Sequence, residues 1–242
     1  VFEDAKLSTC VFVTENSTDR ASFRVRVHPG KDIVPASPSL VLKPDDVKLY
    51  DPENQPIVAC SQEDWDLAVR IIASGRMRRL GEFCGAYQGE VNETTDGEKG
   101  NISENPKDGP RILRGSNVCL YVLREASQGE DIYLRKGKYL DGKRQDAKAW
   151  HHKERRKGLQ ESSPQNNFRR IIASVVPKGE FCNHLINYFQ EQESRIPLET
   201  VLAILDSKLA DWYFRLGSTN AHVSHYQLYI LPTPAFEDDP SD

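Results

Sequence analysis

The sequence lacks the features that would place it in a secreted, membrane or metal-binding class. Its five cysteines are odd in number and far apart, with no C-x-x-C pair, so neither a zinc site nor a redox site is expected. No apolar run approaches the length of a membrane span, and the first residues carry no secretory leader pattern. We therefore expect reduced thiols, no membrane partner and a cytoplasmic location.

Catalytic motifs are missing as well. A methyltransferase needs a glycine-rich turn for its methyl donor, and an amino-methylase also needs a polar-Pro-Pro-aromatic motif that accepts the target amine, but neither occurs in the 242 residues. The phosphate-cradling G-x-x-x-x-G-K-[ST] loop is absent too. The D-x-K pattern of metal-dependent nucleases occurs five times, which makes each match weak. We expect no catalytic, cofactor-binding or metal-binding residue in this chain.

The charge of the whole chain gives no support for nucleic-acid binding, but one segment does. There are 32 Lys and Arg against 36 Asp and Glu, a net charge of 32 − 36 = −4. From Arg135 to Lys157, however, ten basic residues face three acidic ones, a local balance of 10 − 3 = +7. Tyr139 and Trp150 are interleaved with these cations, which combines phosphate-seeking charge with ring faces. This composition favours contact with DNA.

The first half of the chain predicts short strands and one helix. Strands are expected over residues 8–13 and 23–27, the second with period-two alternation. A helix should begin after the N-cap residue Ser61 and end at Gly75. The polar stretch that reaches Gly109 predicts an exposed loop.

The second half predicts more strands and the clearest helix. Strands are expected over residues 111–115 and 118–122, in one sheet, over 169–176, and finally over 226–231. One amphipathic helix is expected from Leu198 to Gly217, because large apolar residues recur there at helical spacing.

Four blocks, taken in order, resemble the target recognition domains of type IIG and type I restriction-modification systems. They read LGEFCGAYQGEVN, GPRILRGSNVCLY, RRIIASVVPKG and PLETVLAILDSKLADWYFRLGSTNAHVSHYQLYILPTP. Asp206 stands where that family usually has Asn, which is a mild departure. Residues 1–60 resemble the closing strands of an adenine-N6 methyltransferase domain.

The resemblance implies a mixed α/β (α+β) fold, with a mixed sheet and flanking helices. It implies the C-terminal strands of a methyltransferase-like domain at 1–60, a linking helix at 61–79, the recognition domain at 80–236 and an acidic tail at 237–242. The expected partners are double-stranded DNA and a catalytic methyltransferase domain, with or without a nuclease domain. That catalytic domain would flip an adenine and methylate it from S-adenosylmethionine, while this chain itself would hold no cofactor.

The candidate DNA contacts lie in the loop from Gln88 to Lys107, in the basic segment, on the strands of the second and third blocks, and in a polar loop of the fourth block. They are Gln88, Asn92, Lys99, Arg111, Arg114, Arg135, Lys136, Lys138, Lys143, Arg144, Lys148, Trp150, His151, His152, Lys153, Arg155, Arg156, Arg169, Arg170, Asn220 and His222.

Two other functions remain open at this point. The chain could be a metal-dependent endonuclease that uses Asp141 or Asp146, both in the basic segment. It could also be a protein-interaction subunit of such a system, with the methyltransferase-like strands and the Leu198–Tyr213 helix at a subunit interface.

Overall fold

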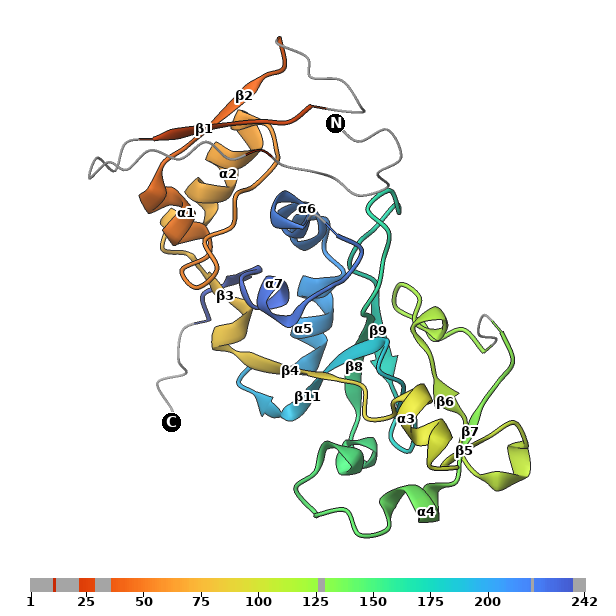
Figure 1. Ribbon diagram of the computed structural model, residues 1–242. Helices are drawn as coiled ribbons and strands as arrows, with labels where there is room; N and C mark the ends of the chain where they lie inside the picture. Colours follow the sequence, from red (N-terminus) through yellow and green to blue (C-terminus); the bar gives the residue numbers. More distant parts are fainter. Residues whose placement is uncertain (1–10, 12–21, 29–35, 126–128, 219, 237–242) are drawn as a thin grey trace, which may run out of the picture. The chain divides into compact units, whose positions relative to one another are not determined.

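The structure is a computed structural model that describes residues 11, 22–28, 36–125, 129–218 and 220–236 (Figure 1). Its contacts divide the chain into two compact units, unit 1 from Val1 to Met77 and unit 2 from Arg78 to Asp242. The predicted α+β class is confirmed, because the structure contains helices together with short strands that form small sheets. The strand expected over residues 8–13 lies outside the described residues, apart from Val11.

Unit 1 contains a strand pair and two helices: β1 (Phe23–Arg26), β2 (Ser39–Leu42), α1 (Pro44–Tyr50) and α2 (Gln62–Ala73). β1 confirms the predicted strand and pairs antiparallel with β2. The helix predicted after Ser61 is confirmed as well, since the Ser61 hydroxyl accepts a hydrogen bond from the amide of Asp64 at 3.1 Å. The rings of Tyr50 and Trp65, 5.3 Å apart, join α1 to α2. α2 therefore belongs to the core of unit 1.

β3 (Met77–Arg79) begins at the last residue of unit 1, and all the elements that follow it belong to unit 2. They are η1 (Leu80–Glu82), β4 (Cys84–Gln88), α3 (Glu93–Glu98), β5 (Ile102–Ser103), η2 (Pro106–Asp108), β6 (Ile112–Leu113), η3 (Gly115–Asn117), β7 (Tyr133–Leu134), α4 (Lys136–Leu140), η4 (Lys148–Lys153), β8 (Arg156–Gln160), β9 (Ala173–Val176), β10 (Phe181–Cys182), β11 (Ile186–Ser194), α5 (Leu198–Leu205), α6 (Lys208–Gly217), α7 (His225–Tyr229) and β12 (Pro232–Pro234).

The main sheet of unit 2 has four strands in the order β4-β11-β8-β9. All three of its strand pairs are antiparallel, so this four-stranded sheet differs from the mixed sheet that the resemblance implies. A parallel pair occurs instead between the short strands β6 and β10. Helix α5 packs on β8, β9 and β11 and covers one face of the sheet.

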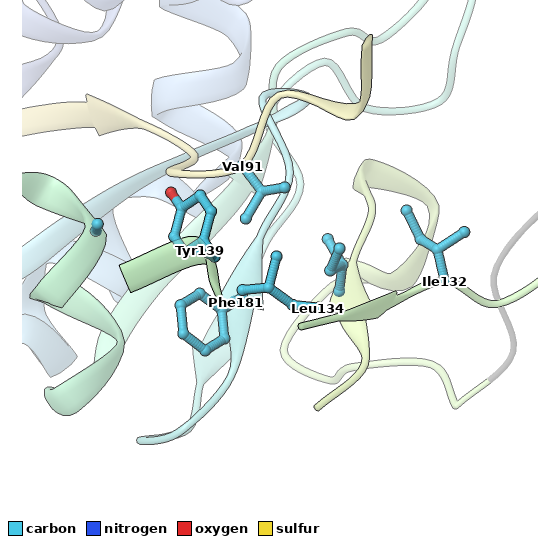
Figure 2. Packing of buried hydrophobic residues seen from close by; sticks show 7 residues of the cluster. Val91, Ile132, Leu134, Tyr139 and Phe181 are labelled. Carbon is cyan, nitrogen blue, oxygen red and sulfur yellow. The ribbon is translucent and has the colours of Figure 1, made fainter. Parts of the chain in front are cut away.

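A cluster of buried apolar residues lies beside β6 and β10 and supports the basic segment (Figure 2). Tyr139 and Ala149 from that segment pack there against Val91, Leu134 and Phe181. Tyr139 also donates a hydrogen bond from its hydroxyl to the carbonyl of Glu90. These contacts anchor both α4 and η4, so the segment is held at two points although it is mostly polar.

The single helix predicted over Leu198–Gly217 is wrong, because the chain forms two helices there. α5 ends at Leu205, and Ser207 begins α6 by accepting a hydrogen bond from the amide of Ala210 at 3.0 Å. The Asp206 carboxylate turns away from the helix and accepts from the amide of Ala173 at 3.1 Å. Two polar side chains that compete for backbone amides thus interrupt an otherwise continuous apolar stripe.

The last predicted strand, over residues 226–231, is also wrong. The segment forms the short helix α7, which begins after Ser224. Gln227 reaches back and accepts from the amide of Ser224 at 3.4 Å, and this is the capping-box spacing S-x-x-Q. The aromatic and β-branched residues of HYQLYI favour a strand by propensity, but the cap decides the outcome locally.

Two loop predictions need correction. The stretch before Gly109, predicted as an exposed loop, contains α3, β5 and η2, and its residues Asp96 and Asn101 are buried and hydrogen-bonded to each other at 3.1 Å. The strand predicted over residues 118–122 is a tight turn, closed by the Cys119 amide and the Val122 carbonyl at 2.9 Å. It does not join Ile112 and Leu113 in one sheet.

The strand predicted over residues 169–176 is shorter in the structure, where β9 covers only Ala173–Val176. The amides of Arg170 and Ile171 donate to the Asp211 carboxylate at 2.6 and 3.0 Å instead of to a neighbouring strand. An acidic side chain from α6 therefore takes the place of a strand partner.

Candidate nucleic-acid interface

Three lysines of the basic segment lie over aromatic rings. The Lys143 ammonium is 4.3 Å from the ring centroid of Tyr139, and the Lys153 ammonium is 4.3 Å from that of Trp150. Lys136 lies over Phe181 at 5.8 Å. Each ring holds its lysine near the surface by a cation–π contact without neutralising the charge.

Two further lysines of the segment bind backbone carbonyls. Lys138 donates to the carbonyl of Lys99 at 2.6 Å, and Lys148 donates to those of Gln88 and Gly89 at 3.1 Å. A carbonyl dipole orients an ammonium group but leaves its net charge in place. We call these five lysines and their three rings the lysine–ring surface: Lys136, Lys138, Lys143, Lys148 and Lys153, with Tyr139, Trp150 and Phe181.

Within the described residues, none of the five lysines forms an ion pair with a carboxylate. The arginines of the segment, in contrast, do form such ion pairs. Arg135 pairs with Asp108 at 3.0 Å, and Arg144 pairs with Asp146 through its Nε at 3.0 Å. Arg155 pairs with Glu199, which Lys157 also contacts. The positive balance of the segment is therefore carried by its lysines, whereas its arginines are neutralised within the fold.

Arg156 lies in the core, where it cannot reach a ligand. Both its side chain and that of Glu90 are 0% exposed, and one guanidinium nitrogen contacts both carboxylate oxygens at 2.9 and 3.0 Å. A second nitrogen donates to the carbonyl of Glu180 at 2.6 Å. Burial raises the pKa of Glu90, and the charge of Arg156 opposes that rise. Sequence reasoning missed Glu90, since a lone Glu gives no sign of its distant partner.

The two adjacent histidines do not add charge to the lysine–ring surface. His152 is buried and stacks on Phe181 with ring centroids 4.3 Å apart. His151 is half-buried, and its Nδ1 lies 2.9 Å from the Tyr188 hydroxyl. Burial lowers the pKa of both rings below the ordinary value, and the charge of Arg156 lowers both further. Both are therefore neutral at pH 7.

Three candidates in the first loop and on the strand after it already form hydrogen bonds or ion pairs within the protein. Asn92 caps α3 through the amides of Thr94 and Thr95. Two guanidinium nitrogens of Arg114 donate to the Glu93 carboxylate at 3.0 and 2.8 Å. Arg111 forms an ion pair with Asp131 at 3.8 Å.

Gln88 and Lys99 remain exposed beside the lysine–ring surface. Each supplies a backbone carbonyl to one of its lysines, Gln88 to Lys148 and Lys99 to Lys138.

The last four candidates gather near α6, away from the basic segment. Arg170 is buried and donates to the carbonyl of Asn220 at 2.6 Å, and Arg169 donates to that of Ser207 at 2.7 Å. The exposed His222 lies 2.8 Å from the Glu161 carboxylate. The structure thus divides the predicted contacts into a lysine-rich group and an α6 group, and it assigns Arg156, Arg170 and His152 to the core.

The described residues contain no group of three or more His, Cys, Asp or Glu side chains that could hold a metal ion. Asp141 and Asp146 are both exposed. None of the described helices is long and apolar enough to cross a membrane. Comparison of the chain with protein-family models and with curated proteins finds no match.

Proposed function

We propose that unit 2 binds double-stranded DNA through the lysine–ring surface, as the target recognition domain of a restriction-modification adenine-N6 methyltransferase. The observation that carries this proposal is the set of five lysines on α4, on η4 and between them, which form no ion pair within the described residues and are held by rings and carbonyls. Such cations neutralise backbone phosphates and release counterions, which drives binding without regard to sequence.

The methyl-transfer part of the proposal rests on the order of the four sequence blocks. Neither the glycine-rich donor turn nor the polar-Pro-Pro-aromatic motif occurs in this chain, so no residue in it is assigned to S-adenosylmethionine. The recognition domain would orient the duplex, and a separate catalytic domain would flip and methylate the adenine.

Salt-dependent binding of a fluorescent duplex of about 20 base pairs tests the DNA-binding part, with anisotropy measured at about 50 and 200 mM salt. The variant Lys136→Ala, Lys143→Ala, Lys153→Ala should weaken binding to every sequence alike. Its slope of log K against log salt should be shallower by roughly 0.9 for each phosphate that the variant no longer neutralises. Arg156 is left intact, because its removal would leave the buried Glu90 carboxylate unpaired.

A control variant with the same change in net charge is Lys43→Ala, Lys48→Ala, Lys208→Ala, whose lysines are exposed and lie outside the lysine–ring surface. It should bind as the unmodified protein does. Equal weakening in both variants would mean that only net charge matters, and the lysine–ring surface would then not be the interface.

A further inference from the structure

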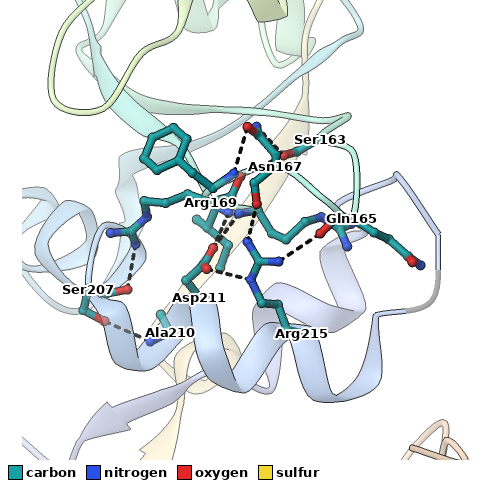
Figure 3. Close-up of polar contacts among 11 residues, drawn as sticks. Ser163, Gln165, Asn167, Arg169, Ser207, Ala210, Asp211 and Arg215 are labelled. Atoms are coloured by element: carbon teal, nitrogen blue, oxygen red, sulfur yellow. Dashed lines mark hydrogen bonds and ion pairs between the residues drawn. The ribbon is translucent and has the colours of Figure 1, made fainter. Parts of the chain in front are cut away.

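The connection between β8 and β9 contains a loop, Pro164–Phe168, that is held in place by several hydrogen bonds (Figure 3). We call it the amide loop. Arg215 of α6 donates to the carbonyl of Gln165 at 3.0 Å and to that of Asn167 at 2.9 Å. The Asn167 side chain donates to the Ser163 hydroxyl at 3.2 Å, and that hydroxyl donates to the carbonyl of Arg169 at 3.0 Å.

Arg215 is itself fixed by Asp211, one turn earlier on α6. The Arg215 Nε donates to the Asp211 carboxylate at 2.9 Å, and the other oxygen of that carboxylate accepts from the amides of Arg170 and Ile171. One buried carboxylate therefore binds the segment that leaves the loop and also positions the guanidinium that holds the loop. The amide loop is thus attached to α6 through two neighbouring side chains.

The side chains at the tip of this loop are free, in contrast to its backbone. Gln165 and Asn166 are exposed, and within the described residues their side-chain amides form no hydrogen bond. Phe168 is 76% exposed, so its ring is accessible to a ligand beside these two amides. A rigid backbone that presents unpaired amides and an apolar ring is preorganised for a ligand, because little entropy is lost when these groups are engaged.

The chemistry of these side chains matches the edges of base pairs. The amide of Asn or Gln can form two hydrogen bonds with adenine, and an apolar side chain such as Phe can contact the methyl group of thymine. A loop held by a rigid helix is also the usual position for residues that select a ligand. Nothing in the sequence singles out this loop, because Ser-Ser-Pro-Gln-Asn-Asn has the composition of an ordinary turn.

We infer that the amide loop is a base-reading element, in which Gln165 and Asn166 bind base edges of duplex DNA and Phe168 contacts them. This inference rests on the proposed function and adds to it. The lysine–ring surface supplies affinity that is independent of sequence, and the amide loop supplies discrimination between sequences.

Selection from a duplex library with a randomised central segment of about 14 base pairs tests this division, since one site spans roughly one helical turn. The unmodified protein should enrich a sequence motif. The variant Gln165→Ala, Asn166→Ala should lose preference at one or two positions of that motif, by roughly 5- to 100-fold per position. Its affinity for unselected duplex should stay within about twofold, because phosphate contacts are untouched.

Gln192→Ala is the matched control, since Gln192 is an exposed amide on β11 outside the loop, and it should leave the motif unchanged. Melting temperatures of all variants should agree, because the substituted side chains are exposed. An unchanged motif for the Gln165→Ala, Asn166→Ala variant would overturn the inference while leaving DNA binding intact. Absence of duplex binding by the unmodified protein would overturn the proposed function and the inference with it.

Discussion

Neighbouring basic residues in one sequence run have opposite roles in this protein. Lys153 is exposed over Trp150, whereas Arg156, three residues later, is buried against Glu90. A buried ion pair contributes little net stability, but removal of one partner leaves an uncompensated charge in the core. The several donors of an arginine suit this buried site, where one nitrogen binds the Glu90 carboxylate and another the carbonyl of Glu180, and the compact ammonium of a lysine suits exposed phosphate contact. Whether a basic residue is lysine or arginine therefore helps to distinguish an exposed cation from a buried one, which a count of charges alone does not.

Asp206 gives a prediction at the residue scale. Burial raises its pKa to about 6, although the amides of Ala173 and Tyr121 favour the charged form. Because the pKa in the unfolded chain is lower, about 3.9, this group destabilises the fold progressively as the pH rises from about 4 through 6. Asp206→Asn keeps an acceptor for the Ala173 amide and removes the charge. The free energy of unfolding should rise by roughly 1 to 3 kcal/mol at pH 8 and change far less at about pH 4.

Urea denaturation at the two pH values measures this difference, and a similar change at both would contradict it. Asp211→Asn is the control of opposite sign. Burial alone would raise the pKa of Asp211, but hydrogen bonds from Arg215 and from the amides of Ile171 and Arg170 outweigh that effect, and the pKa is lowered. Its charge therefore stabilises the fold above about pH 4, and the stabilisation is lost as the pH falls further. The substitution should destabilise the protein at pH 8.

At the scale of elements, side-chain caps decide where helices begin. Ser224 and Gln227 start α7 in a segment of strand-forming composition, and Ser207 starts α6 in the middle of an apolar stripe. Each cap satisfies a backbone amide that would otherwise lack a partner at the first turn. The direction of α6 matters for the amide loop, because Asp211 and Arg215 project from it.

Ser207→Ala should therefore lower the free energy of unfolding by roughly 0.5 to 2 kcal/mol, because the amide of Ala210 loses its acceptor. Chemical denaturation followed by circular dichroism measures the effect. Ser162→Ala is the control, since Ser162 is exposed and caps no described helix. Equal stability of the two variants would show that the α5–α6 break does not depend on the cap.

At the scale of the whole molecule, β8 leads from η4 to the amide loop, which lies beside α6 (Figure 1). Lys153 and Ser163 are ten residues apart in the sequence, with β8 between them, so their Cα atoms lie at most about 34 Å apart. This is close to one helical turn of B-form DNA. We predict that one duplex contacts both surfaces along one of its sides.

Hydroxyl-radical footprinting on the selected site should reveal two protected patches about 10 base pairs apart on one side of the duplex. The Gln165→Ala, Asn166→Ala, Phe168→Ala variant should leave one patch unprotected and keep the other. A single short patch in the unmodified protein would contradict the arrangement.

The features that depend on local chemistry could be predicted from the sequence. The strand at β1 and α2 with its Ser61 cap follow from periodicity and capping residues close together in the chain, whereas the α+β class is what the resemblance implied. The local surplus of positive charge is likewise visible as a run of residues. The same local signals are present at Ser207 and Ser224, but apolar spacing and strand propensity outweigh them in a prediction from sequence.

Only the tertiary structure decided which of the basic residues are free. Glu90, Asp108 and Glu199 come from distant segments to neutralise Arg156, Arg135 and Arg155, whereas the five lysines of the lysine–ring surface remain without carboxylate partners among the described residues. The same holds for the amide loop, whose rigidity depends on a guanidinium roughly fifty residues away. Sequence by itself determined the residue types and the local elements, because these depend on neighbours in the chain. Partners distant in sequence determined charge and rigidity, because burial and ion pairing depend on contacts that form only when the chain folds.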